Sequence, residues 1–579
     1  MDSVQPTDRS LDVLATESST HARQFIQRAE HLRSRHERAT RKRFVRLFDD
    51  PAALDVTIAL TDEVMRFTSP RSALAVLRRV APLSSIRGFG LVNALGLRFI
   101  AWMSKWLPHT ALRIVHARVA SLSGDLILNA ERRRLAKFAD QRRAQGLALN
   151  INVLGEAVLG EHEALLRFDQ VVEMVRRPGV DYVSVKLSSI ASQLITLDST
   201  GSLERVADRL RALYREAQRC STFINLDMEE YRDLRLTIEA FQLVLSEAEF
   251  VTLNAGIVLQ AYLPDSHAAL SELLTWAKHR HLRHGGRIKI RLVKGANLAM
   301  ERAEAEVHGW TAAPYATKAD VDASYARMID TCLRPAWADA VRIGVASHNL
   351  FHVAWALDVA RARGVSDQLD VEMLEGMANA EARALAEHGH RVVLYAPVTR
   401  RDDFAAAVAY LVRRLDENTA PENYLRAAFS IAQRPSVFSE QEHRFSSSLE
   451  RRHEISTASR RHGDVARPRV GFVNVADADP TNPDFVTDVT RALREVRSIT
   501  DWFVGTEEER SQSSPESEIG RDPSASGAPW YRYHVADDRR VDEVVATSSR
   551  ACSSWGVRSA SDRGDVLRQV ATVIEQCRP

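Results

Sequence analysis

Cysteine is scarce in this chain and is not arranged for disulfides or metal. Among 579 residues there are four cysteines, spread widely at Cys220, Cys332, Cys552 and Cys577. They form no CxxC pair, and no histidine lies at ligand spacing from them. This pattern argues against a disulfide framework and against a zinc site, and it predicts a protein of the reducing cytoplasm.

Long apolar runs are also missing. The most apolar region, 91–108, is interrupted by Arg98 and Lys105, and a spanning helix needs about 20 predominantly apolar residues. The first twenty residues are polar and have no apolar core, so no signal peptide is expected. We therefore expect no membrane anchor, which leaves open peripheral contact with the inner face of the cell membrane.

Neither sign of charge dominates the sequence. The chain has 78 Lys and Arg against 76 Asp and Glu, a net charge of +2, and the two signs are interleaved. A nucleic-acid partner is therefore not expected. The densest basic run, 35–44, is interpreted as a solvated helix face, with a phosphate-binding patch as the alternative.

The sequence also lacks the motifs by which side chains or a bound metal carry out catalysis. No nucleophile with its base and no HExxH sequence can be identified. The stretch GFGLVN at 88–93 has Asn93 where a dinucleotide turn needs its third glycine, and it follows no strand, so we interpret it as a connection between helices.

The order of expected elements indicates an α/β fold. Residues 1–140 read as successive helices without a strand, and eight β-branched runs then alternate with helical segments. That count and order predict a (β/α)8 barrel of the TIM type. The competing fold is a doubly wound open sheet, but the glycine-rich turn expected after its first strand is missing. The runs cover 147–156, 180–189, 223–230, 255–264, 287–296, 341–349, 369–376 and 391–398.

Composition divides the chain into five regions. A helical arm (1–140) precedes the barrel (141–435), and a connecting region (436–504) follows it. Residues 505–529 are rich in Ser, Pro and Glu and are predicted to form a disordered linker. Residues 530–579 are predicted to form amphipathic helices that begin a further domain, which is incomplete at Pro579.

Polar side chains mark the C-terminal ends of the predicted strands, where barrel enzymes build their active sites. These residues are Glu156, Lys186, Asp227, Gln260, Arg291, Lys294, His348, Asn349, Glu372 or Glu375, and Tyr395. Arg291 is a permanent cation on a barrel strand, which predicts a bound anion or an ion pair with Asp227 or Glu156. A site rich in cations and amides, without a nucleophile, indicates that a cofactor carries the chemistry.

Two smaller features have both a functional and a structural interpretation. His348 is either a hydrogen-bonded structural residue or a catalytic base. Thr317 and Lys318 precede a helix that Asp320 is expected to cap, which predicts a phosphate cradle, with a solvated loop as the alternative.

The stretch YLVRRLDEN, 410–418, places polar groups on one face of an expected helix. Tyr410, Arg413, Arg414 and Glu417 fall at i, i+3, i+4 and i+7. Guanidinium forks match the geometry of carboxylates, so this face favours a small carboxylate ligand over a pteridine such as a folate.

Eight motifs occur in a fixed order: LNINVLGEA, VSVKLSS, LDMEE, LQAYLP, RLVKGA, ASHN, YAPV and YLVRRLDEN. Together they resemble the proline dehydrogenase barrel of the bifunctional proline utilization A flavoenzymes, over residues 20–475. The resemblance implies a distorted (β/α)8 barrel with FAD, which takes a hydride from C5 of L-proline and yields 1-pyrroline-5-carboxylate. This is the first step of proline degradation to glutamate, and the electrons would pass to a membrane quinone.

The resemblance also implies roles for particular residues. Arg413 and Arg414 would clamp the proline carboxylate, Glu417 would orient them, and Glu156 would close the far side of the site. Lys186, Asp227, Leu374, Tyr395 and Tyr410 would line the substrate pocket. Arg291 would face flavin N5. The remaining FAD contacts would come from Gln260, Val293, Lys294, Gly295, Ala296, Thr317, Lys318, His348 and Asn349.

This chain departs from the family pattern in a few places. Asn297 and Leu298 stand where many members have aromatic residues, and the spacing from Tyr395 to Tyr410 indicates a small insertion. No ribbon-helix-helix module precedes the helices, so a DNA-binding role is not expected. The C-terminal residues look like the first helices of an aldehyde dehydrogenase half, and with Cys552 and Cys577 out of context we expect no aldehyde oxidation.

Three hypotheses follow from the sequence. The leading one is an FAD-dependent proline dehydrogenase, for which a homo-oligomer is left open. The alternatives are another flavin barrel, such as a folate reductase, and a catalytically impaired remnant of a truncated bifunctional enzyme.

Overall fold

The computed structural model describes residues 8–48, 50–64, 67, 69–123, 127–155, 157–400, 410, 422–461, 476–498, 503–504, 517–524 and 526–576. The chain divides into two compact units, Met1–Asp477 and Ala478–Pro579. Among the described residues, every helix is too short or too polar to cross a lipid bilayer.

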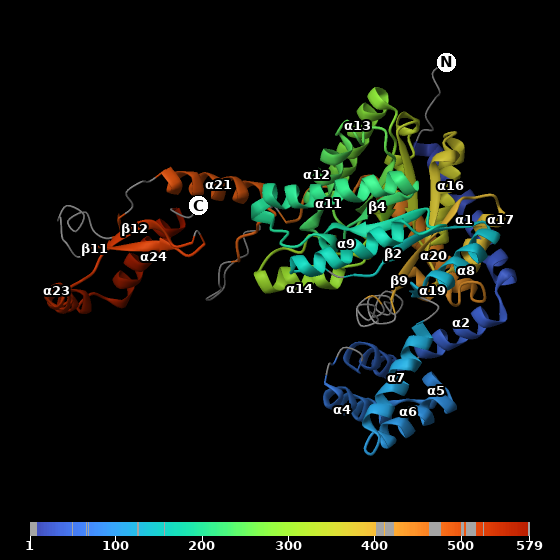
Figure 1. Cartoon of the computed structure of the whole chain (residues 1–579), viewed down its shortest axis with the longest axis horizontal. Coiled ribbons are helices and arrows are strands. Elements are labelled where there is room, and N and C mark those ends of the chain that lie inside the picture. The colour runs from blue at the N-terminus through green and yellow to red at the C-terminus, as the bar shows by residue number, and fades with distance from the viewer. Residues whose placement is uncertain are drawn as a thin grey trace. The chain divides into compact units, whose positions relative to one another are not determined.

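A closed parallel barrel forms the centre of the first unit (Figure 1). Each strand pairs with the next, and the last strand pairs with both its predecessor and the first, as in Leu147 opposite Val392. All eight predicted strands are confirmed, because their β-branched residues are buried on both faces. They are β2 (Leu147–Val153), β3 (Tyr182–Lys186), β4 (Phe223–Asp227), β5 (Ala255–Gln260), β6 (Ile288–Val293), β7 (Val341–Ala346), β8 (Leu369–Leu374) and β9 (Val392–Thr399).

One short strand was not predicted. The strand β1 (Leu128–Asn129) pairs in parallel with the end of β9, so the expectation of a strand-free region before residue 140 is wrong. Two residues are too few to show an alternating pattern. Their pairing depends on β9, whose Thr399 carbonyl accepts from the backbone N–H of Ala130 at 2.9 Å.

Helices surround the barrel (Figure 1). Leucine, valine and alanine side chains on their inner faces join those of the strands in one continuous core. The helices between strands are α9 (Glu161–Val175), α10 (Leu187–Ile190), α11 (Ser199–Cys220), α12 (Asp233–Leu245), α13 (Ser266–His284), α14 (Leu298–His308), α15 (Lys318–Cys332), α16 (Leu350–Ala362) and α17 (Asn379–Glu387). Helices α8 (Arg132–Ala144), α19 (Tyr424–Ala428) and α20 (Pro435–Glu450) precede or follow the barrel.

Two N-terminal helices precede the other helices of this region, and the first of them packs against the barrel helices. The helix α1 (Asp8–Leu32) packs on α16 and α17, and the Ser18 hydroxyl donates to Asp358 Oδ2 at 2.8 Å. The basic run 35–44 lies on α2 (Arg35–Phe48), where most of its side chains are exposed, as expected for a solvated helix face.

The next helices form a module with a core of its own, which we call the helical module. It comprises α3 (Pro51–Ala59), the π-helical turn η1 (Leu60–Val64), α4 (Pro70–Val80), α5 (Ile86–Phe89), α6 (Leu91–Met103) and α7 (Pro108–Ser123). Gly90 joins α5 to α6 at φ 77°, so the stretch GFGLVN is a helix connection as predicted.

The second unit contains helices and a small sheet. Its helices are α21 (Pro483–Ser498), α23 (Asp538–Gly556) and α24 (Ala560–Gln576), and its sheet has the order β10 (Phe503–Val504), β12 (Ala528–His534), β11 (Ser517–Asp522). Strand β11 lies within 505–529, so the expectation of a disordered linker is corrected for its residues. Its polar sequence pairs with the aromatic strand β12, where the Tyr533 hydroxyl donates to Glu518 Oε2 at 2.6 Å.

Candidate active site

A cavity of about 290 Å³ lies at the C-terminal ends of the barrel strands. Fourteen of the predicted site residues line it: Lys186, Asp227, Gln260, Arg291, Val293, Lys294, Gly295, Ala296, Lys318, His348, Asn349, Leu374, Tyr395 and Tyr410. Thr317 lies beside it, at the start of α15. Glu156, Arg413, Arg414 and Glu417 lie outside the described residues. The structure thus brings together residues from separate strands, as the strand-end pattern predicted.

The buried centre of the cavity is an ion pair between two strands. Arg291 Nη2 on β6 donates to Asp227 Oδ1 on β4 at 2.6 Å, and its Nη1 donates to the Ser184 hydroxyl at 3.2 Å. The Tyr395 hydroxyl donates to Asp227 Oδ2 at 2.9 Å, and the guanidinium carbon of Arg291 lies 4.9 Å from the centre of the Tyr395 ring. Of the two readings for Arg291, the ion pair with Asp227 is the one found in this structure.

Burial and charge reinforce this arrangement. Burial pulls the pKa of Arg291 down, but the nearby carboxylates of Asp227 and Glu372 outweigh it, and the pKa is raised. Burial, followed by the charge of Asp227, holds the pKa of Tyr395 well above its usual value. The arginine is therefore a fixed cation and the tyrosine a neutral donor under all physiological conditions.

A second ion pair connects Lys186 to the loop after β4. Its Nζ lies 2.7 Å from Glu229 Oε1, and it also donates to the carbonyl of Gly155 at 3.4 Å. The lysine is buried and Glu229 is partly exposed. Because a lysine tethered at both sides has few rotamers left, its charge is positioned at the cavity wall before any ligand binds.

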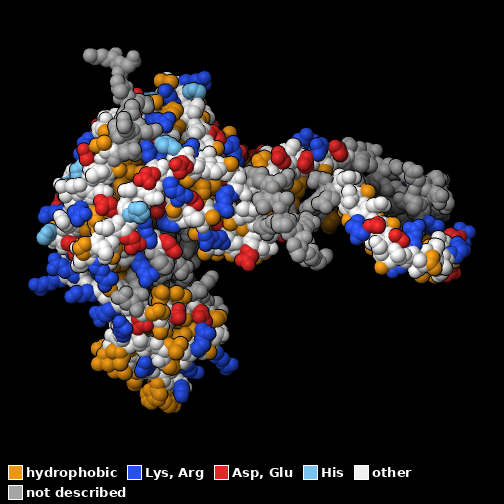
Figure 2. Space-filling view, turned by 180° about the vertical axis from the view of Figure 1, so that it is seen from behind, with side chains coloured by type: hydrophobic (Ala, Val, Ile, Leu, Met, Phe, Trp, Pro, Cys, Tyr) orange, Lys and Arg blue, Asp and Glu red, His pale blue; other side chains and the backbone are white. Residues whose placement is uncertain are grey.

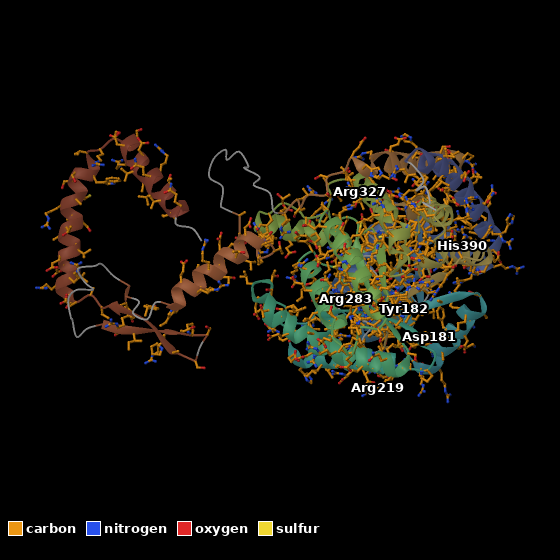
Figure 3. The ribbon with its side chains drawn as sticks, turned by 90° about the horizontal axis from the view of Figure 1, so that it is seen from above. Asp181, Tyr182, Arg219, Arg283, Arg327 and His390 are labelled. Carbon is orange, nitrogen blue, oxygen red and sulfur yellow. The ribbon has the colours of Figure 1, made fainter. Side chains whose placement is uncertain are left out.

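A charged layer below Arg291 was not predicted from the sequence. Lys289 Nζ lies 2.8 Å from Asp370 Oδ2 and 2.6 Å from Glu372 Oε1, and all three side chains are buried. The same Nζ lies 5.1 Å from the centre of the Tyr182 ring, which is labelled in Figure 3. The sequence does contain a pattern that could have revealed this layer. Lys289 and Arg291 are two residues apart on β6, as Asp370 and Glu372 are on β8, so each pair lies on one face of its strand.

The two strand-end candidates on β8 differ in orientation. Glu372 points into the barrel and shares Lys289 with Asp370. Glu375, after the strand, instead accepts from Arg142 Nε on α8 at 3.0 Å and from the backbone of Gly376 at 3.1 Å. Glu372 is thus the one that lines the cavity.

Two lysines share one carboxylate beside the cavity. Lys294 Nζ lies 2.6 Å from Asp322 Oδ1, and Lys318 Nζ contacts the same oxygen. Burial, opposed by Asp322, lowers the pKa of Lys294 to about 8. Burial alone would raise the pKa of Asp322, but the two lysines outweigh it and the pKa is lowered. This group has one more cation than anion, which favours an anionic ligand. The i, i+4 spacing of Lys318 and Asp322 would have revealed the missed aspartate.

The cap of α15 differs from the predicted one. Thr317, not Asp320, occupies the N-cap position, and its hydroxyl oxygen accepts from the Asp320 backbone N–H at 3.2 Å. Asp320 instead lies in the first turn and accepts the Thr317 hydroxyl proton at 2.6 Å. Both residue types cap helices, so the sequence could not decide between them.

Gly295 provides the close approach that the sequence predicted at the end of β6. Its φ is +117°, and a Cβ at this position would lie 2.4 Å from the Tyr262 ring. Only glycine fits here, because both the backbone conformation and the ring exclude a side chain. At the end of the neighbouring strand β5, the Gln260 amide donates to the carbonyl of Met228 at 3.2 Å.

His348 and Asn349 follow β7 and are held by local hydrogen bonds. The Leu374 backbone N–H donates to His348 Nε2 at 3.4 Å, and Asn349 caps α16 by accepting from Phe351 N at 3.0 Å. This bond gives His348 a structural contact, while its ring still lines the cavity. Asn297, which replaces an expected aromatic residue, is buried and also lines the cavity.

The fold and the site define the class of protein: a (β/α)8 barrel enzyme whose buried cations lie at the C-terminal mouth. A family model described as proline dehydrogenase matches residues 135–427. The chain belongs to this proline dehydrogenase family, and its barrel is related to those of the PutA proteins.

Individual relatives agree with this assignment. The chain is 29% identical to "Proline dehydrogenase" of Deinococcus radiodurans over 49% of this chain and 81% of that protein. It is 26% identical to "Bifunctional protein PutA" of Escherichia coli over 48% of this chain and 22% of that protein.

Two solved structures extend the comparison. Proline utilization A from Corynebacterium freiburgense is 44% identical, with a TM-score of 0.58, over 72% of this chain and 40% of that one. The Bdellovibrio bacteriovorus protein, 22% identical with a TM-score of 0.78, covers 97% of this chain and 57% of its own, and shows the fold alone. The chain thus spans less than two thirds of the length of each of these two proteins.

Proposed function

We propose that this chain is an FAD-dependent dehydrogenase that oxidises L-proline to 1-pyrroline-5-carboxylate and passes the electrons to a quinone. Membership of the proline dehydrogenase family supports the reaction. The observation that carries the proposal is the set of predicted substrate and cofactor residues gathered around one cavity, with the Arg291–Asp227–Tyr395 group at its centre.

The donor set of the site fits a flavin dinucleotide. Gly295 allows a ligand to approach the backbone, and the surplus cation of Lys294 and Lys318 suits a diphosphate. The N-termini of α15 and α16 follow strand ends on the same side of the barrel. We propose that FAD is held by Gln260, Arg291, Val293, Lys294, Gly295, Ala296, Thr317, Lys318, His348 and Asn349. When bound, FAD would accept the hydride.

The chain's own residues would position and polarise the reactants. Arg291 is the buried cation assigned to the flavin side, and Asp227 fixes its direction through a 2.6 Å bond. Lys186, Leu374, Tyr395 and Tyr410 would line the proline pocket together with Asp227. Arg413 and Arg414 would bind the proline carboxylate, and Glu417 would orient them. Glu156 would close the site. These four roles are inferred from the sequence motifs.

One experiment separates this function from its alternatives. The purified protein should be yellow, and anaerobic addition of L-proline should bleach its flavin absorbance. A yellow protein that proline does not bleach would point to another flavin barrel, and a colourless protein to a catalytically impaired remnant. The matched control is D-proline, whose carboxylate would be presented with the opposite hand.

Several partner assignments belong to the same proposal. We assign a membrane quinone as electron acceptor, a cytoplasmic location with peripheral contact to the inner membrane face, and no nucleic-acid partner. A homo-oligomer is compatible with the proposal. The resemblance of residues 530–579 to the start of an aldehyde dehydrogenase remains a prediction from the sequence.

A further inference from the structure

A second cavity, of about 820 Å³, lies at the N-terminal ends of the barrel strands, at the opposite end of the barrel from the candidate active site. We call it the lower cavity. Among the described residues, it shares no lining residue with the active-site cavity. The charged layer separates the two, because Lys289 and Asp370 line the lower cavity and Glu372 lines the active-site cavity.

The wall of the lower cavity is rich in cations. Over the face of the barrel that Figure 2 shows, basic and acidic side chains are interspersed. The lower cavity instead has seven cations against three carboxylates, and two carboxylates outside the wall, Glu173 and Glu372, pair with Arg177 and Lys289. An excess of two cations therefore remains among the described residues, which favours an anionic ligand. The lining cations are Arg132, Arg143, Arg177, Arg287, Lys289, Arg342 and Arg391, and the carboxylates are Asp140, Asp181 and Asp370.

The carboxylate of Asp370 is shared by three of these cations. Lys289 Nζ lies 2.8 Å from Oδ2, Arg342 Nη2 lies 2.7 Å from Oδ1, and Arg391 Nε lies 3.4 Å from Oδ1. Arg342 stands opposite Lys289 in the parallel register of β6 and β7, so both point into the barrel. One carboxylate cannot balance three cations, and the surplus lies at the cavity wall.

Arg287, just before β6, has no carboxylate partner among the described residues. Its Nη2 donates to the carbonyl of Ala338 at 3.1 Å, and its Nε is buried without a described hydrogen-bond partner. A buried donor that makes no hydrogen bond costs free energy. An anion bound at this guanidinium would compensate its charge.

The other side of the lower cavity is apolar. The half-buried ring of Phe223, at the start of β4, meets the ring of Tyr182 edge to face, with the ring centroids 4.9 Å apart. A Cβ on Gly256 would lie 3.0 Å from the Phe223 ring, so the glycine makes room for that ring inside the barrel. Leu135 and Ala139 of α8 extend this apolar side. Tyr182 is labelled in Figure 3.

We propose that the lower cavity binds a small organic anion. Its carboxylate or phosphate groups would contact Arg287, Arg342 and Arg391, and its apolar part would contact Phe223 and α8. Guanidinium forks match the planar and tetrahedral oxygens of both kinds of anion. A cavity of this volume is of the size that holds small ligands, and a mainly apolar wall with a few fixed polar groups is typical of such sites.

Calorimetric titration of the full chain tests the ligand class. Phthalate carries two carboxylates on a ring, and phenyl phosphate carries a phosphate, so the tighter of the two identifies the preferred anion. Inorganic phosphate, which lacks the apolar part, should bind at least about tenfold more weakly than phenyl phosphate. Benzyl alcohol, which lacks the charge, should show no binding.

A pair of variants places the binding in the lower cavity. Arg287→Gln combined with Arg391→Gln removes two charge-assisted contacts and should weaken binding of the preferred anion by at least about tenfold. The matched control is Arg219→Gln combined with Arg283→Gln, which removes the same charge. Both control residues are exposed, lie in the last turns of α11 and α13 at the same end of the barrel, and are labelled in Figure 3. This control should bind like the wild type.

Chemical modification provides a second readout that needs no variant. The side chain of Arg391 is 59% exposed, so phenylglyoxal should modify it in the free protein. Bound phthalate or phenyl phosphate should slow that modification, while Arg283 should react at the same rate with and without the anion. Mass spectrometry of the peptides measures both rates. Thermal unfolding should show that the variants are folded, and the single change Arg391→Gln, at an exposed side chain, replaces the double variant if that one is not.

Three results would overturn the proposal: no binding of either ring-bearing anion, binding that the changes at Arg287 and Arg391 leave intact in folded protein, and no protection of Arg391. The arginines of the lower cavity would then serve only the ion pairs of the barrel. None of these measurements uses proline or the flavin, so their outcome is independent of the proposed function.

Discussion

Asp227 connects two functional side chains at the centre of the site, since Arg291 and Tyr395 both donate to its carboxylate. Its replacement by alanine would leave the buried Arg291 with the Ser184 hydroxyl at 3.2 Å and the more distant Glu372 carboxylate at 3.9 Å. Removing one partner of a buried ion pair costs about 3–5 kcal/mol. We therefore expect Asp227→Ala to lower the free energy of unfolding by that amount, as measured by urea denaturation.

Two variants control this measurement. Asp227→Asn keeps one acceptor oxygen in place of two and should be destabilised less than Asp227→Ala. Glu249→Ala removes an exposed partner of Arg215 and should leave the stability nearly unchanged, because solvent screens such pairs. Equal stability of Asp227→Ala and the wild type would contradict the buried pair.

Glu301 should make the stability depend on pH. Burial raises the pKa of its carboxyl from 4.5 to about 7, although the backbone N–H of Tyr231 donates to it at 2.7 Å. Its Oε2 is buried and has no hydrogen-bond partner among the described residues. The folded state thus binds a proton that the unfolded state releases, and stability should fall as pH rises from 4.5 to 7.

Glu301→Gln removes this titration while it keeps an acceptor for Tyr231. Its melting temperature relative to the wild type should rise between pH 5 and pH 8, by an amount equivalent to about 1–3 kcal/mol. Differential scanning calorimetry at the two values measures it. A difference that does not change with pH would show that the Glu301 carboxyl titrates at its ordinary pKa.

At the scale of elements, the start of α15 depends on Thr317. Its hydroxyl oxygen accepts from Asp320 N and its proton goes to the Asp320 carboxylate. The loss of an N-cap costs about 1 kcal/mol. Thr317→Ala should lower the stability by this amount in chemical denaturation, and Thr317→Ser, which keeps the oxygen, should not. If serine and alanine have the same effect, the cap is not what stabilises this helix.

The stretch 410–418 is the element assigned to the substrate carboxylate. A desolvated, charge-assisted hydrogen bond contributes about 1.5–3 kcal/mol. Arg414→Met should therefore raise the KM for proline roughly ten- to a hundredfold in steady-state assays. The control Arg400→Met removes an exposed partner of Glu173 and should leave KM unchanged. An unaltered KM for Arg414→Met would remove Arg414 from the carboxylate site.

Some elements could be predicted from the sequence and others could not. The eight strands and Arg291 were predicted, because β-branched runs and the alternation of strand residues depend on local sequence. The sequence left two candidate partners for Arg291, Asp227 and Glu156, because it does not say which strands lie side by side. Strand β1 and the lower cavity could not be predicted, because both depend on which distant residues pack beside them.

At the scale of the whole molecule, the barrel core is contained in the first unit. Its buried cluster extends from Ala22 to Ile455, all before the boundary at Asp477. A chain of residues 1–477 should therefore bind flavin and unfold at the same temperature as the full chain, within about 2 °C. Flavin absorbance and calorimetry would test this, and loss of flavin from the shorter chain would show that the second unit supports the site.

The ion pairs of β6 reach in two directions around the barrel. Lys289 pairs with carboxylates on β8, whereas Arg291 pairs most closely with Asp227 on β4 and lies 3.9 Å from Glu372 on β8. A chain divided between β5 and β6 would leave Arg291 in one fragment and Asp227 in the other. The fragment that contains Arg291 would keep only the longer pair with Glu372 at 3.9 Å, and Asp227 would lose its arginine, so the two halves should gain structure on mixing. The buried charges at the site thus also join strands from both halves of the barrel, so that neither half is expected to fold fully alone.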